Sequence, residues 1–209
     1  MVVSVRILRG AQLVGHERLL ADESRLAGHA DALAMPASEA ALSAVLAACA
    51  AERLDVTLSS GHTGIAGGAV PQGGVAVHCG RMDACLGLFE RDGGWFLRCG
   101  PGVTLAALRG ALSRKDFGDT TVWSEADRAA LARFRSSGVF SFAVDPTETS
   151  ACLGGMVACN ASGARSFRHG AMRRHPSAAE AMPSFRPPAR KCYCCACETL
   201  LPLRGDGYR

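Results

Sequence analysis

Apolar residues at helical spacing predict three helices along the chain. The first follows Ser38, whose hydroxyl can cap a helix, and is expected to end near Glu52. The second follows Thr104, which can cap in the same way, and the third is expected to run from Ser124 to Ser136. The residues that set the period are Ala41, Leu42, Val45, Leu46 and Cys49 in the first helix, Leu105, Leu108 and Leu112 in the second, and Leu131 and Phe134 in the third. Each set places one apolar stripe along a helix, which predicts packing against a core.

Short apolar runs between the helices predict strands. They are expected near residues 2–8 and at 56–58, 75–78, 95–99 and 140–144. Two glycine-rich segments directly follow two of these strands, the first at 59–69 and the second at 145–163. From residue 56 the expected order is therefore strand, glycine segment, strand, strand, helix, helix, strand and glycine segment.

The first glycine-rich segment has the composition of an anion-binding loop. Small residues after a buried strand point successive backbone N–H groups into one concavity, and Ser59, Ser60 and Thr63 add hydroxyl donors. The segment lacks the pattern G-x-x-x-x-G-K-[ST], and it leads to another strand instead of opening a helix with G-x-G-x-x-G. The P-loop and Rossmann interpretations are therefore excluded.

The second glycine-rich segment has the character of a ligand clamp. An aspartate-proline step at 145–146 predicts an extended or turn start, and paired glycines at 154–155 leave the backbone open to close approach. Asn160 and Ser162 follow, and their short polar side chains can hydrogen-bond a ligand without filling the space around it.

Composition and charge narrow the classes of function. With 209 residues and 48% hydrophobic content, the chain can bury a core. Its net charge of +4 comes from scattered Lys and Arg with no basic run interleaved with aromatics, which argues against a nucleic-acid partner. The ten cysteines follow no disulfide framework, so reduced thiols and a cytoplasmic location are expected. Charged residues within 1–20 argue against a signal peptide, and the lack of a long apolar run argues against a transmembrane segment.

Several spaced motifs occur together in the order found in one known family. They are Pro36-Ala37-Ser38-Glu39, the loop from Ser59 to Gly68 with Val70-Pro71-Gln72-Gly73-Gly74, Arg81-Met82-Asp83, Gly100-Pro101-Gly102-Val103-Thr104-Leu105, Asp145-Pro146-Thr147-Glu148, Leu153-Gly154-Gly155-Met156-Val157-Ala158, Asn160-Ala161-Ser162-Gly163-Ala164-Arg165-Ser166 and Gly170. Over about residues 35–173 the chain resembles the FAD-binding domain of the vanillyl-alcohol oxidase and para-cresol methylhydroxylase (PCMH) type, close to D-lactate dehydrogenase and the glycolate oxidase D subunit.

The resemblance implies an α+β fold, a two-lobed PCMH-type FAD-binding domain that is incomplete and lacks the C-terminal cap domain. This domain is expected at 36–173, with lobes at about 36–103 and 104–173, after a lead-in at 1–35 and before an atypical tail at 174–209. FAD would lie between the lobes, its pyrophosphate wrapped by the first glycine loop and its pyrophosphate and ribityl chain held by the second. The cofactor-binding residues expected on this basis are Ser59, Ser60, Gly61, His62, Thr63, Gly64, Gly67, Gly68, Pro146, Thr147, Ser150, Gly154, Gly155, Asn160, Ser162 and Gly163.

The same resemblance implies the FAD-binding portion of an oxidoreductase that acts on a 2-hydroxy acid such as D-lactate or glycolate, by hydride transfer to flavin N5. The small 2-hydroxy acid is expected as a partner if a cap domain is supplied. The reduced flavin passes its electrons to an acceptor that the sequence does not identify. Neither loop holds an acid or base at motif spacing, so no catalytic residue and no metal ligand is assigned. His62 stands where the family usually has a small residue, and contact with solvent or pyrophosphate is expected for it, not a covalent bond to FAD. His78 is expected to have a surface or structural role.

The tail departs from the family. In place of a cap domain, which in the family carries the substrate-binding arginine, the chain has a Pro-, Ala- and Ser-rich stretch at 176–188 and four cysteines between Cys192 and Cys197. Residues 198–205 resemble the family again, which motivates the hypothesis that about 176–197 are translated out of frame; resequencing the locus tests it. Two alternatives to a hydroxy-acid dehydrogenase stay open: a noncatalytic flavin-binding remnant, and a metal-binding module centred on the cysteine cluster.

Overall fold

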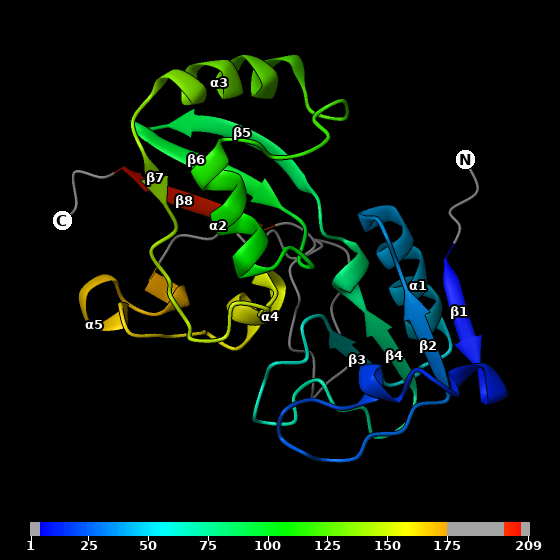
Figure 1. Cartoon of the computed structure of the whole chain (residues 1–209). Coiled ribbons are helices and arrows are strands. Elements are labelled where there is room, and N and C mark those ends of the chain that lie inside the picture. The colour runs from blue at the N-terminus through cyan, green and yellow to red at the C-terminus, as the bar shows by residue number, and fades with distance from the viewer. Residues whose placement is uncertain (1–4, 175–198, 206–209) are drawn as a thin grey trace.

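The computed structural model describes residues 5–174 and 199–205, which fold into two lobes with one four-stranded sheet each (Figure 1). Helices and strands are mixed in both lobes, so the predicted α+β class is confirmed. In the described part of the chain, no helix is both long and apolar enough to cross a membrane.

The first lobe is a mixed sheet covered by one helix. Its strands are β1 (Arg6–Arg9), β2 (Ala32–Met35), β3 (Val56–Ser59) and β4 (Val75–His78), in the order β1-β2-β4-β3. Strand β1 is antiparallel to β2, whereas β2 and β3 both run parallel to β4. Helix α1 (Glu39–Ala51) buries its predicted apolar stripe against this sheet, and Ser38 caps it by accepting a hydrogen bond from the Ala41 N–H at 3.2 Å. Short 3₁₀ turns lie at Gly10–Leu13, Glu17–Leu20 and Cys79–Arg81.

The second lobe is an antiparallel sheet with helices packed on it. Its strands are β5 (Cys85–Arg91), β6 (Gly94–Cys99), β7 (Phe140–Ser141) and β8 (Thr199–Gly205), in the order β5-β6-β8-β7. Helices α2 (Leu105–Arg114) and α3 (Glu125–Ser136) bury their apolar faces in its core. Trp95 and Phe134 meet edge to face at the centre of that core, with ring centroids 5.2 Å apart. Two short helices, α4 (Leu153–Ala158) and α5 (Ser166–His169), and a 3₁₀ turn (Met172–Arg174) follow β7.

The helix predictions are confirmed, including the caps at Ser38 and Thr104. Strands β3, β4 and β6 also lie where apolar runs predicted them. The expected strand at 140–144 is shorter, because only Phe140 and Ser141 pair with β8, before the chain turns toward the second glycine loop. Strand β5 was not predicted, because Gly87 and the bulge between Cys85 and Gly87 interrupt its alternation.

Two domain boundaries differ from the expected ones. The chain before residue 36 is more than a lead-in, because β1 and β2 form half of the first sheet and every residue of β2 is buried. The lobes divide near residues 82–84 instead of near 103, because β5 and β6 form a hairpin within the second sheet. The Pro-rich stretch, the cysteine cluster and the out-of-frame hypothesis all concern residues outside those described.

Candidate functional site

The first glycine loop starts in the core and emerges at the surface. Ser59 and Ser60, at the end of β3, are 4% and 7% exposed, whereas Gly64 and Gly68 are exposed. The Ser59 hydroxyl has no hydrogen-bond partner among the described residues, although it is buried. A buried hydroxyl without a hydrogen-bond partner costs free energy unless a ligand or an ordered water bonds to it, so this atom is a candidate contact for a polar ligand group.

Residues 21–26 pack against this loop, a contact that no sequence motif indicates. A Cβ on Gly67 would lie 2.7 Å from Leu26 Cδ1, and the Asp22 Oδ2 atom is the nearest group to Gly64, at 3.8 Å from its Cβ position. The Asp22 Oδ2 atom is itself buried without a partner in the described ranges. Gly67 is favoured there by its φ of +71°, whereas the exposed Leu26 side chain could move aside for a Cβ.

His62 is held by protein contacts on both ring nitrogens. Its Nδ1 atom lies 2.8 Å from the Ala21 carbonyl, and its Nε2 atom lies 3.2 Å from Nδ1 of His78, on which the ring stacks at 5.2 Å between centroids. Burial lowers the pKa of both rings; that of His78 falls to about 4, with the nearby His62 charge as a second cause. Both imidazoles are therefore neutral at pH 7, and His78 has a structural partner that sequence spacing could not show.

The second glycine loop is closed at its base. A Cβ on Gly163 would lie 1.6 Å from the Asp145 carbonyl oxygen, so the two ends of the loop touch and only glycine fits. The Asp145 carboxylate accepts from Arg109 of α2 and lies 3.4 Å from Nε of Arg165. These two arginines fix the loop on the second lobe, and only the pairing of charges in space, not a sequence motif, identifies them.

Inside the second loop, the paired glycines differ in their surroundings. Gly154 is buried against Pro101, and a Cβ there would lie 2.5 Å from the proline Cβ. Gly155, one residue further along α4, faces open space: among the described residues, no heavy atom outside its own helix turn lies within 4 Å of a Cβ there. Asn160 has a φ of +51°, which ends α4 and turns the chain back toward residue 163. Gly155 is therefore the position where a bound group can approach the backbone.

The two glycine loops meet although they lie far apart in the sequence. A Cβ on Gly61 would lie 2.9 Å from the backbone N of Cys152 and 3.2 Å from the Ser150 carbonyl oxygen. Cys152 also forms a β-bridge with Thr104, the cap of α2, and the Leu105 and Ala106 N–H groups donate to the carbonyls of 151 and 149. The structure thus brings both predicted cofactor loops together at the start of α2.

The remaining predicted residues lie along the two loops with varied exposure. The side chains of Thr147, Ser150 and Ser162 are exposed, and those of Thr63 and Pro146 are partly exposed. The Ser150 N–H donates to Glu148 Oε1 at 2.8 Å, which shapes the turn before α4. All these positions are open to a ligand from the loop surface.

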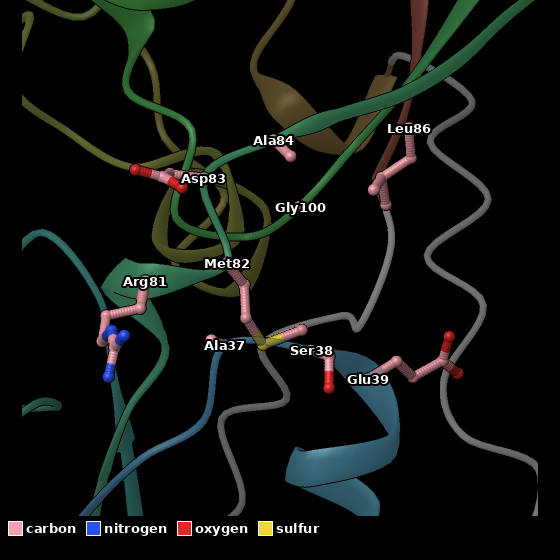
Figure 2. A pocket seen from close by; sticks show the side chains of 9 residues that line it. All are labelled: Ala37, Ser38, Glu39, Arg81, Met82, Asp83, Ala84, Leu86 and Gly100. Atoms are coloured by element: carbon pink, nitrogen blue, oxygen red, sulfur yellow. The ribbon is translucent and has the colours of Figure 1, made fainter. Parts of the chain in front are cut away.

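A pocket of about 190 Å³ lies at the junction of the lobes, lined by residues 37–39, 81–84, Leu86 and Gly100. Figure 2 shows the Met82 side chain directed toward Ala37 and Ser38 at the start of α1. None of the predicted cofactor-binding residues lines this pocket, and its volume is below the roughly 300–1,000 Å³ typical of sites that enclose a whole ligand. It can receive only part of a large cofactor.

Comparison with known proteins agrees with these features. Residues 30–131 match the family model of the FAD binding domain. This segment, a little under half of the chain, is similar to FAD binding domains. FAD is accordingly its cofactor, and the matched residues include the whole first glycine loop but end before the second. A search of curated protein sequences found no match.

Solved structures share the fold of most of this chain. Among them are 6-hydroxy-D-nicotine oxidase from Arthrobacter nicotinovorans (14% identity, TM-score 0.60, covering 83% of this chain and 32% of that one) and a carbohydrate oxidase from Microdochium nivale (18%, 0.59, 83% and 32%). Aclacinomycin oxidoreductase aligns with 97% of this chain and 41% of its own, at 16% identity and TM-score 0.61. The chain thus spans 32–41% of the length of these structures.

The residues present fit the cofactor of an FAD binding domain. The unpartnered Ser59 hydroxyl can donate to a phosphate oxygen, and the open backbone at Gly155 admits a flat or extended group. Among the described residues, no cluster of three or more His, Cys, Asp or Glu side chains could hold a metal ion.

Proposed function

We propose that this chain holds FAD across its two lobes, with the pyrophosphate between the first glycine loop and the second. The contact of Gly61 with the Ser150–Cys152 backbone carries the proposal, because it joins the two loops into one surface. The buried, unpartnered Ser59 hydroxyl at the base of that surface supports it. A loop wrapped around pyrophosphate satisfies such a donor without any further side chain.

The proposed binding residues divide into three groups by role. Hydroxyl hydrogen bonds would come from Ser59, Ser60 and Thr63. The glycines would either leave the backbone accessible to FAD or allow the loops to close; they are Gly61, Gly64, Gly67, Gly68, Gly154, Gly155 and Gly163. The surface of the site would be lined by His62, Pro146, Thr147, Ser150, Asn160 and Ser162. His62 would act as a neutral ring, because burial lowers its pKa. When bound, FAD supplies the hydride-accepting flavin, and the protein binds and orients it.

We further propose that the cofactor serves an oxidoreductase of 2-hydroxy acids such as D-lactate or glycolate. The support is the motif resemblance over about residues 35–173. The solved structures with this fold are named for nicotine, carbohydrate and aclacinomycin substrates. The choice of a 2-hydroxy acid therefore rests on the motif resemblance alone. Free thiols at all six described cysteines accord with the proposed cytoplasmic location.

Retention of flavin by matched glycine variants tests the cofactor site. The variants are Gly155→Leu and, as control, Gly138→Leu, because a Cβ at either position meets no heavy atom of the described part of the chain within 4 Å. Each protein is incubated with FAD, desalted and examined by absorbance, with circular dichroism to verify folding. We expect the wild type and Gly138→Leu to retain flavin bands and Gly155→Leu to lose them while staying folded. Equal retention by both folded variants would contradict the placement of FAD at the second loop.

Anaerobic mixing with substrate tests the oxidoreductase proposal separately. FAD-loaded protein is mixed with D-lactate, glycolate or buffer, and flavin absorbance is followed. Bleaching by either hydroxy acid supports the dehydrogenase. Retained flavin that neither acid bleaches would contradict the hydroxy-acid proposal for this chain and favour the noncatalytic flavin-binding alternative.

A further inference from the structure

Two buried cysteines face each other across the hairpin that begins the second lobe. Cys85 of β5 and Cys99 of β6 are direct antiparallel partners. Beside them, the Gly100 N–H donates to the Ala84 carbonyl at 2.9 Å, the bond that flanks a non-hydrogen-bonded pair. The Cα atoms in such a pair lie about 4.5 Å apart, within the 4.4–6.8 Å range of disulfide-linked residues.

The thiols of this pair already interact. The Cys99 thiol hydrogen-bonds the Cys85 sulfur, which lowers the pKa of Cys85. The same hydrogen bond, together with complete burial, raises the pKa of Cys99 well above its ordinary value. Cys85 is therefore the more nucleophilic of the two, and Cys99 lies where its sulfur can attack Cys85 in a second step.

The pair is adjacent in sequence to residues that line the pocket at the lobe junction. Ala84 and Leu86 flank Cys85 in sequence, Gly100 follows Cys99, and all three line that pocket (Figure 2). Cys85 keeps 9% of its surface exposed, whereas Cys99 has none. Of the two thiols, Cys85 is therefore the one that a small oxidant can reach first.

We propose that Cys85 and Cys99 form a reversible disulfide when the protein meets hydrogen peroxide. The Cys85 thiolate attacks one peroxide oxygen; the S–O bond forms, the O–O bond breaks, and hydroxide leaves and takes up the proton released by Cys85. The Cys99 sulfur then attacks the Cys85 sulfur; the S–S bond forms, the S–O bond breaks, and hydroxide leaves with the Cys99 proton as water. Overall, two thiols and one peroxide give one disulfide and two waters.

The new bond would link strands at the connection between the lobes. Cys85 follows residues 82–84, where the chain passes from the first lobe to the second, and Gly100 and Gly102 donate to the carbonyls of 84 and 82. A disulfide at this point closes a 15-residue loop in the unfolded chain, so oxidation should stabilise the folded protein. This property needs neither FAD nor substrate.

Tryptic mapping of the full-length protein tests the proposal directly. Cleavage after Arg81, Arg91, Arg98 and Arg109 places the two cysteines in separate peptides, 82–91 and 99–109, each with one cysteine. Native protein is treated with a small molar excess of hydrogen peroxide, alkylated under denaturing conditions, digested without reductant and analysed by mass spectrometry. The variants Cys85→Ser and Cys99→Ser are treated alike, and Cys159→Ser, which changes an exposed cysteine, is the matched control.

We expect a linked 82–91/99–109 peptide in the oxidised wild type and in Cys159→Ser, and its absence from both pair variants and after dithiothreitol. The oxidised wild type should also melt at a higher temperature than the reduced protein, a shift that dithiothreitol reverses. The proposal is overturned if peroxide leaves both peptides separately alkylated, or links either one to another cysteine. The wild-type map decides the matter even where a variant fails to fold.

Discussion

At the scale of single residues, the glycines of the two loops serve different purposes. A Cβ at Gly163 would overlap the Asp145 carbonyl at 1.6 Å, so Gly163→Ala must push the two ends of the second loop apart. We expect a loss of about 2–3 kcal/mol in the free energy of unfolding, measured by urea denaturation. Gly138→Ala adds the same methyl group in open space and should change stability by less than about 0.5 kcal/mol. Equal stability of the two variants would show that the base of the loop is not closed.

The His62–His78 pair predicts how stability depends on pH. The pKa of His78 is lowered to about 4 in the folded protein, first by burial and then by the His62 charge, so the unfolded chain binds the proton more readily. Stability should therefore be complete above about pH 6.5 and fall as the pH drops toward 4. The shift corresponds to about 3 kcal/mol before screening, and the partial exposure of the ring reduces it to about 1–2 kcal/mol.

Urea denaturation at pH 7.5 and pH 5 measures this dependence. His78→Gln, which cannot take up the proton, should lose less stability between the two pH values than the wild type. His29→Gln, which removes an exposed histidine, is the control and should follow the wild type. If His78→Gln loses as much stability between pH 7.5 and pH 5 as the wild type does, protonation of His78 is not the cause.

At the scale of elements, one ion pair fastens α3 to the sheet of the second lobe. Arg98 of β6 donates to the Asp127 carboxylate at 2.8 Å, and the same carboxylate accepts from the Ser124 hydroxyl at 2.6 Å. The Asp127 side chain is 7% exposed, so Asp127→Ala leaves a half-buried arginine without its partner. We expect a loss of about 2–3 kcal/mol by urea denaturation, less than for a fully buried pair because Arg98 is 34% exposed.

Glu125→Ala is the matched control for this pair. It removes a carboxylate from the same first turn of α3, but from an exposed side chain. Only the interaction with the helix dipole is lost, about 0.3–1 kcal/mol. Similar losses of stability in the two variants would mean that the effect comes from charge at the start of the helix and not from the ion pair.

The elements that the sequence predicted share one property, a local signal. Helices α1 and α2 can be predicted because all their signals lie close together in the sequence: a cap at Ser38 or Thr104, followed at once by an apolar stripe. Strand β2 has no such signal. From the sequence its four residues were assigned to the lead-in, and only their burial and the pairing of β2 with β1 and β4 identify them as a strand. The same holds for the site: glycine content predicts both loops, whereas the packing of residues 21–26 and the Arg109–Asp145 pair depend on contacts distant in sequence.

At the scale of the whole molecule, a distant segment completes the second lobe. Strand β8 lies between β6 and β7, and β7 pairs with no other strand of that sheet in the described chain (Figure 1). Leu201 and Leu203 of β8 are 0% and 6% exposed in the core that also holds α2 and α3. The fold of residues 85–144 therefore depends on residues about a hundred positions later.

Removal of β8 should consequently unfold the second lobe and spare the first. A chain that ends before Thr199 loses Leu201 and Leu203 and opens an edge of β6, so we expect loss of the near-ultraviolet signal of Trp95 and Trp123, with aggregation. A chain that ends after Gly205 is the control and should unfold like the full protein. The milder variant Leu201→Ala should cost about 2–5 kcal/mol in urea, because it empties a fully buried position. If the shortened chain keeps its tryptophan signal and cooperative unfolding, β8 adds to a sheet that is already stable, and the segment from residue 199 is dispensable for the fold.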